Sequence, residues 1–81
     1  MSALARIREY LDLYEEAKVI YESDAEWETK FDLIFSDHIS KPMNKLFRLD
    51  YYDPDTTYEE DVTAWFWAAT DKADDLKKII R

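Results

Sequence analysis

The chain has 81 residues and a formal net charge of −8, from 19 acidic and 11 basic side chains. Its length allows one domain, which we place at residues 1–81. With 47% hydrophobic residues the chain is too apolar for intrinsic disorder, so we expect a packed core. The acidic excess argues against direct binding to nucleic acid or to a membrane surface, because phosphate groups require clustered cations. It is compatible with a partner protein that has a basic surface.

Cysteine and glycine are both absent, and each absence disfavours a class of structure. Without cysteine there is no disulfide and no thiolate metal site, which favours a cytoplasmic location. Without glycine, tight β-hairpins, P-loops and dinucleotide-binding loops are disfavoured. No run of the sequence approaches the ~18–20 apolar residues of a membrane span, and residues 1–9 do not form a secretory signal. We therefore expect an all-α fold.

The first expected helix covers residues 2–22, with Ser2 as its N-cap. Its apolar face at helical spacing consists of Ala3, Ile7, Tyr10, Tyr14, Ala17 and Tyr21. Glu9, Asp12 and Glu16 fall together on the opposite face. Leu13, Val19 and Ile20 widen the apolar part, which leaves open a role for this helix in self-association.

A second helix is expected over residues 24–39, with Ser23 and Glu26 at the spacing of a capping box. Its apolar positions are Trp27, Phe31, Ile34, Phe35 and His38. We expect Ser40 to cap a third helix that has Pro42 in its first turn. A basic side of that helix is formed by Lys41, Lys45 and Arg48.

Residues 50–56 are expected to form a loop, because Asp-Pro and its neighbouring acids favour turns. Thr57 and Glu60 form a further capping box, which opens a last helix to about Arg81. Its predicted buried positions are Val62, Trp65, Phe66, Ala69, Ala73, Leu76 and Ile80. A kink or split at Thr70 and Asp71 is left open. The chain as a whole is predicted to be a compact bundle of three to four helices.

No arrangement of residues typical of a catalytic or metal site is recognisable. His38 is the single histidine, and we expect it to be packed or half-exposed, since a metal site needs three or four ligands. The segment that starts at Asp53 departs from a calcium loop, with Tyr58 where glycine is needed and Ala64 where a glutamate is needed. We therefore expect no enzymatic activity, no cofactor and no metal.

Exposed acids and aromatic rings are the remaining candidates for function. Acids cluster in residues 9–28 and 50–61, where they either present a binding surface or only solubilise the protein and complement helix dipoles. Successive helical residues diverge by about 100°, so Trp65, Phe66 and Trp67 cannot all be buried, and Trp67 is expected to be exposed. The tyrosines near the loop either cover the core or form a binding hot spot. The predicted partner-binding residues are Glu9, Asp12, Glu16, Tyr51, Tyr52, Asp53, Asp55, Tyr58, Glu59, Glu60 and Trp67.

Residues 51–67 resemble the bacterial colicin immunity proteins. The resemblance rests on the run Tyr51-Tyr52-Asp53-Pro54-Asp55, on the acids Glu59, Glu60 and Asp61, and on Trp65. Immunity proteins are small acidic four-helix domains that block a basic nuclease with a Tyr-Tyr-Pro motif and an acidic helix. Asp53 interrupts that motif here and the family's glycines are missing, so the resemblance implies an analogous way of binding.

These patterns favour a small acidic inhibitor or modulator that presents carboxylates and tyrosines to a basic, nucleic-acid-binding surface of a partner protein. Such a DNA mimic is similar, as a class, to small helical phage proteins, anti-CRISPR and anti-restriction proteins among them. One alternative is an assembly subunit that forms homo-oligomers through the first helix. Another is a nuclease inhibitor of the immunity-protein kind. We expect a monomer or a homodimer.

Overall fold

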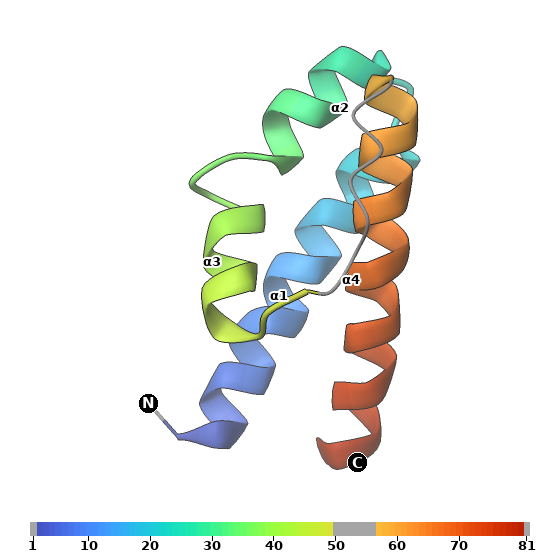
Figure 1. Ribbon diagram of the computed structural model, residues 1–81. Helices are drawn as coiled ribbons and strands as arrows, with labels where there is room; N and C mark the ends of the chain where they lie inside the picture. The colour runs from blue at the N-terminus through green and yellow to red at the C-terminus, as the bar shows by residue number, and fades with distance from the viewer. Residues whose placement is uncertain (1, 50–56, 81) are drawn as a thin grey trace.

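The computed structural model describes residues 2–49 and 57–80, which form four helices (Figure 1). They are α1 (Ala3–Glu22), α2 (Trp27–Ile34), α3 (Ser40–Leu46) and α4 (Tyr58–Ile80). No strand occurs among these described residues, and the expected all-α bundle is confirmed. The long helices α1 and α4 are antiparallel, so the start of α1 and the end of α4 lie at the same end of the bundle (Figure 1).

The packing of α1 against α4 combines small side chains with buried hydroxyl groups. Ala17 of α1 and Ala69 and Ala73 of α4 have no exposed surface, and small interface residues let helix backbones approach closely. The buried hydroxyl of Tyr10 donates a 3.0 Å hydrogen bond to the carbonyl of Ala69. The Tyr14 hydroxyl lies 2.8 Å from Thr70 Oγ1. These bonds fix how far α4 is displaced along α1.

Trp65 fills the space between α4 and the two short helices. Its side chain is only 2% exposed, and its ring meets Phe35 edge to face at a centroid distance of 6.0 Å. Ile34 of α2 and Met43 of α3 are fully buried in the same core. Both short helices therefore cover the α1–α4 pair through a core in which Trp65 is the largest side chain.

The predicted buried faces are confirmed in the middle of the long helices and fail at their ends. Ala3 is exposed, while Tyr21 and Ile80 are half-buried. All three lie in a first or last turn, where neighbouring helices cover less of the surface. The positions that are buried as predicted are Ile7, Tyr10, Tyr14, Ala17, Val62, Trp65, Phe66, Ala69, Ala73 and Leu76.

Serine side chains end two helices where the sequence analysis placed a start or a continuation. Ser2 caps α1 as expected, since its Oγ accepts a 3.1 Å bond from the Ala5 amide. The Ser23 hydroxyl instead donates to the Ile20 carbonyl at 2.7 Å and ends α1. The predicted capping box of Ser23 and Glu26 is therefore wrong, because α2 begins only at Trp27 and Glu26 makes no side-chain cap.

The second helix is shorter than the predicted 24–39. It ends at Ile34, and Ser36 accounts for the ending, because its hydroxyl donates to the Leu33 carbonyl at 2.8 Å and accepts from the His38 amide at 3.3 Å. Such side-chain bonds compete with helix continuation. His38 consequently lies in a turn and is exposed, not packed or half-exposed as predicted.

The remaining helix boundaries agree with expectation in part. Ser40 is the first residue of α3 and does not cap it, since Ile39 occupies the N-cap position without a side-chain bond. Pro42 lies in the first turn as expected. The Thr57 hydroxyl accepts a 3.1 Å bond from the Glu60 amide, which is the first half of the predicted capping box. The Glu60 carboxylate accepts from the Thr57 hydroxyl, also at 3.1 Å, where a full capping box has it accept from the Thr57 backbone amide. α4 is one continuous helix through Thr70 and Asp71.

Tyr10 should make the protein sensitive to alkali. Burial, and to a lesser extent Tyr14, raises the pKa of the Tyr10 phenol above its ordinary 10.0. Above that pH the phenol ionises in the unfolded chain but not in the folded protein, so stability should fall by up to about 1.4 kcal/mol per pH unit. We expect Tyr10→Phe to cost ~0.5–1.5 kcal/mol at neutral pH and to flatten this fall. Urea unfolding between pH 8 and 11 checks it, and parallel curves for the two proteins would contradict it.

The two neighbouring tryptophans of α4 should differ sharply in their contribution to stability. Trp65 is 2% exposed, so Trp65→Ala leaves a cavity and should cost roughly 3–5 kcal/mol. Trp67 is 66% exposed, and Trp67→Ala should change stability by no more than about 0.5 kcal/mol. Chemical denaturation of both variants measures the difference, and similar losses for the two would mean that the face of α4 is assigned wrongly.

Candidate functional site

Four of the predicted partner-binding residues lie on the first three turns of α4. Tyr58 is 45% exposed and Trp67 is 66% exposed, and Glu59 and Glu60 are exposed beside them. The exposure of Trp67 follows from the helical period. The side of α4 that holds Val62 and Phe66 faces the core, and Trp67 lies on the other side of the helix. Trp67 is exposed as the sequence predicted.

Two shallow hollows share the carboxylates of Glu59 and Glu60. The larger, of about 510 Å³, is lined by Trp27, Thr57, Tyr58, Glu59 and Glu60. The smaller, of about 300 Å³, is lined by Glu59, Glu60, Thr63, Ala64 and Trp67. Each hollow thus combines aromatic surface with the same pair of acids.

Trp27 belongs to this surface although the sequence analysis did not select it. Its helix reaches the start of α4 through Phe31, whose ring lies 5.0 Å from that of Tyr58. Trp27 and Phe31 are one turn apart on α2, so their common face can be predicted from the sequence. The pairing of that face with the start of α4 is a tertiary contact that local spacing does not predict.

Lys30 supports Trp27 from inside the bundle and was also missed. It is only 6% exposed, and its Nζ donates a 2.7 Å hydrogen bond to the Tyr21 carbonyl in the last turn of α1. The same Nζ lies 4.3 Å from the centroid of the Trp27 ring. A cation at a helix C-terminus neutralises unpaired carbonyl groups, so Lys30 stabilises the end of α1 and holds α2 against it. The burial of Lys30 could have been predicted from the sequence, because its spacing places it on the same face of α2 as Trp27 and Ile34.

A column of aromatic rings joins α1, α2 and α4 where α1 ends and α4 begins. Phe66 of α4 is stacked between Tyr14 and Tyr21 of α1, at centroid distances of 5.5 and 4.2 Å. Tyr21 in turn meets Trp27 edge to face at 5.9 Å. Stacked and edge-to-face contacts of this kind add to the free energy of burial, so the wall that Trp27 gives to the larger hollow is anchored in the core.

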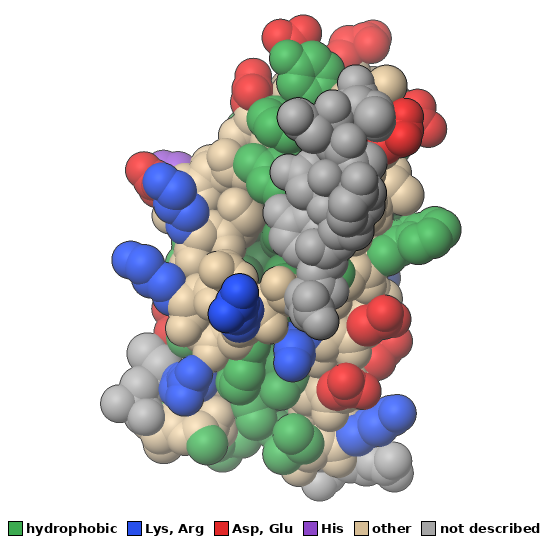
Figure 2. Space-filling model, in the orientation of Figure 1, with side chains coloured by type: hydrophobic (Ala, Val, Ile, Leu, Met, Phe, Trp, Pro, Cys, Tyr) green, Lys and Arg blue, Asp and Glu red, His purple; other side chains and the backbone are tan. Residues whose placement is uncertain are grey.

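Exposed acids gather where α1 ends and where α2 and α4 begin. They are Glu22, Asp24, Glu26, Glu28, Glu59 and Glu60. Residues 21–29 and 57–61 contain no lysine or arginine, and Lys30 beside them is buried. Figure 2 shows acidic side chains at this end of the molecule and basic ones mostly over α3 and below it. We call these six acids, with Trp27, Tyr58 and Trp67, the acidic–aromatic end.

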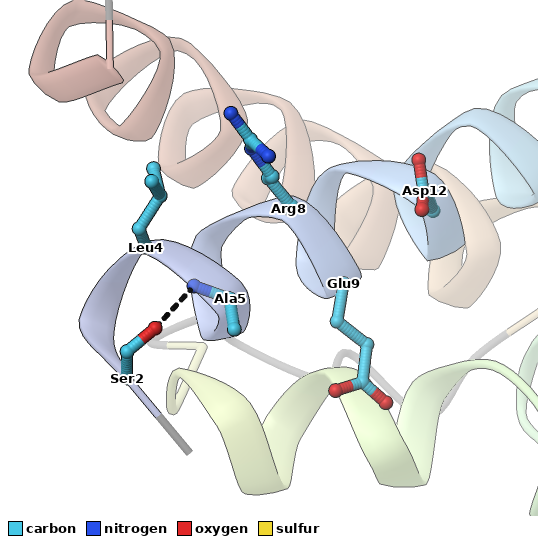
Figure 3. A pocket seen from close by; sticks show the side chains of 6 residues that line it. All are labelled: Ser2, Leu4, Ala5, Arg8, Glu9 and Asp12. Carbon is cyan, nitrogen blue, oxygen red and sulfur yellow. Dashed lines mark hydrogen bonds between the residues drawn. The ribbon is translucent and has the colours of Figure 1, made fainter.

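The second set of predicted acids lies elsewhere on the bundle. Glu9, Asp12 and Glu16 are exposed on α1. Glu9 and Asp12 line a hollow of about 430 Å³ with Ser2, Leu4, Ala5 and Arg8, in which Glu9 and Arg8 leave the helix in different directions (Figure 3). Because α1 and α4 are antiparallel, this hollow lies toward the opposite end from Tyr58 (Figure 1). The two predicted sets therefore do not form one surface.

Tyr51, Tyr52, Asp53 and Asp55 lie outside the described residues. Within the rest of the stretch that resembles the immunity proteins, Asp61 and Trp65 are buried, at 9% and 2% exposure. Of the residues that carry the resemblance, Glu59 and Glu60 are the exposed ones that the structure describes. The described part of the resemblance therefore offers a partner two adjacent carboxylates.

The predicted basic side of α3 is confirmed in part: Lys41 and Lys45 are exposed on the helix, while Arg48 is exposed but lies beyond the helix end at Leu46. The ammonium group of Lys41 lies 2.7 Å from Asp37 in the turn before the helix. This hydrogen bond, with the attraction between the charges, lowers the pKa of the Asp37 carboxyl and raises that of Lys41. One of the three cations is therefore paired within the chain.

Within residues 2–49 and 57–80, no helix has the length and apolar character to cross a membrane. In the same part of the chain, no three histidine, cysteine or acidic side chains are grouped so that they could hold a metal ion. Comparison with protein families, with curated proteins and with solved structures finds no match. Function is therefore inferred from the surface alone.

Proposed function

We propose that this protein binds another protein through its acidic–aromatic end and thereby inhibits or modulates that partner. The partner surface is basic, because the residues at this end offer six exposed carboxylates and no exposed lysine or arginine. Complementary charge speeds association and fixes the orientation of the two proteins, while desolvated aromatic side chains supply most of the binding free energy.

The observation that carries the proposal is the exposure of Trp67 beside Glu59 and Glu60. Its ring is 66% exposed, although its neighbours Trp65 and Phe66 already fill the core. An indole left in water costs solubility, and tryptophan is among the residues most enriched at the centres of protein interfaces. Tyr58, at 45% exposure, extends the same aromatic surface toward Trp27.

In its finer form the proposal makes the partner surface a nucleic-acid groove and the protein a DNA mimic of the anti-CRISPR or anti-restriction kind. The acids that support this form are Glu9, Asp12 and Glu16 of α1, which recur at three and four residues, so that their Cβ atoms lie roughly 5–6 Å apart, comparable to the spacing of phosphates along a strand. A nuclease inhibitor of the immunity-protein kind would use the acidic–aromatic end. The DNA mimic and the nuclease inhibitor would bind different partners, so identifying the captured partner distinguishes them.

An assembly subunit that associates through α1 is a second proposal. Val19 and Leu4 favour it, at 69% and 45% exposure. The main apolar face of α1 is not accessible for self-association, because Ile7, Tyr10 and Tyr14 are buried within the bundle. Light scattering at several salt concentrations separates the two proposals: a monomer at every salt concentration favours the inhibitor, and a stable dimer favours the subunit.

Neutralising the shared carboxylates should abolish partner capture. We would compare Glu59→Gln/Glu60→Gln with Asp74→Asn/Asp75→Asn, since Asp74 and Asp75 form another exposed acidic pair on α4. Glutamine at position 60 keeps an acceptor for the Thr57 cap. The wild-type chain and the control pair should retain the same protein from a lysate of the native cells, with retention falling as salt rises.

The proposal is contradicted if the Glu59/Glu60 variant retains that protein as well as the control does. It is also contradicted if retention does not change between low and physiological salt. Thermal unfolding of the three proteins, measured in parallel, shows whether any loss of binding comes from loss of structure.

A further inference from the structure

We infer that each of the two hollows at the acidic–aromatic end takes one arginine side chain, so that the partner segment recognised there carries two arginines. This inference rests on the proposed function and specifies what the surface selects. A surface that bound by charge alone would need neither the hollows nor the rings around them.

The lining of the hollows matches the guanidinium group. Each hollow has aromatic surface, from Trp27 and Tyr58 in one and from Trp67 in the other, and both include Glu59 and Glu60. A guanidinium is planar, stacks on aromatic faces and can donate two parallel hydrogen bonds to a carboxylate. The ammonium of lysine is more strongly hydrated and donates without a planar match, so this combination favours arginine.

Some of the protein's own cations already lie against aromatic rings. Lys30 lies 4.3 Å from the centroid of Trp27, and the Arg6 guanidinium lies 5.0 Å from that of Phe47. Arg6 also donates to the Leu46 carbonyl, so its guanidinium combines a ring with a hydrogen-bond acceptor. Among the residues that the structure describes, Trp67 has neither a ring contact nor a cation contact. It combines an open ring with adjacent carboxylates, which is the arrangement that a guanidinium from another molecule can complete.

The shared carboxylates explain why two arginines belong to one segment. Both hollows include Glu59 and Glu60, so side chains seated in them lie close together. The second hollow extends along α4 to Trp67, roughly 12 Å from Glu59 at 1.5 Å per residue. Arginines two turns apart on a helix, or four residues apart on a strand, are separated by about 11 to 13 Å, which is comparable.

The test is a titration of the ¹⁵N-labelled full chain with hexa-arginine and with hexa-lysine peptides at physiological salt. The indole N–H signals distinguish the three tryptophans. The signals of Trp27 and Trp67 should move, while that of Trp65, at 2% exposure, should not. Hexa-arginine should bind more tightly than hexa-lysine of equal charge. Trp67→Leu should weaken the arginine peptide about two- to fivefold, as expected for one cation–π contact at an exposed site.

Matched variants distinguish binding in the hollows from binding by the overall charge of the protein. Glu59→Gln/Glu60→Gln should weaken hexa-arginine further than Trp67→Leu does, and Asp74→Asn/Asp75→Asn should leave its binding close to that of the wild type. Should Trp67→Leu fail to fold, Tyr58→Leu applies the same test to the other hollow. Equal binding of the two peptides, or an unchanged affinity in a folded ring variant, would overturn the inference.

The inference and the proposed function can fail separately. If the Glu59/Glu60 variant loses its cellular partner but the peptides are not distinguished, the acidic–aromatic end binds by charge and the arginine inference is wrong. If the peptides are distinguished but the cellular partner is retained by that variant, the hollows bind arginine and the proposed docking surface is wrong.

Discussion

The close antiparallel packing of α4 on α1 is the constraint on which the rest of the structure depends. The buried bond from Tyr10 to the Ala69 carbonyl fixes the register of the two helices, and Ala17, Ala69 and Ala73 allow their backbones to approach. In that register Phe66 enters between Tyr14 and Tyr21. The next residue, Trp67, then lies outside the core face, because it is about 100° round the helix from Phe66 and about 200° from Trp65 in the same direction, and both of those are buried. The exposed indole is thus a consequence of how the core is filled.

The same packing determines where the acids of distant segments meet. It brings the end of α1 and the start of α4 to one end of the bundle, and Lys30 holds α2 there by its bond to the Tyr21 carbonyl. Because Lys30 is buried, its charge is not displayed beside the acids that surround it. The protein therefore presents a negative, partly aromatic end. The exposed cations that the structure describes lie on α3, just after it at Arg48, and toward the opposite end of the bundle, at the start of α1 and the end of α4. The charge of the whole chain gives no indication of this separation.

Features that follow from helical periodicity were predicted correctly from the sequence. Helix boundaries were predicted wrongly where a serine side chain can form either of two hydrogen bonds. The buried faces of α1 and α4 follow from helical spacing, as does the exposure of Trp67. Ser23 was misassigned, and the end of α2 before Ser36 was missed, because a serine can bond to the backbone before it or after it, and the choice depends on the surrounding packing. The larger hollow was not predictable, since Trp27 and Tyr58 meet only through the packing of Phe31. Lys30 was predictable from its position on the face of Trp27 and Ile34.

Hydrogen exchange of the chain, free and bound to its captured partner, tests most directly whether the acidic–aromatic end is the working surface. The account predicts that the partner slows amide exchange in residues 26–30 and 57–67, and leaves exchange in α3 and in residues 71–80 unchanged. Slower exchange confined to residues 9–16 of α1, or to the basic side of α3, would contradict it and would move the binding surface to that part of the bundle.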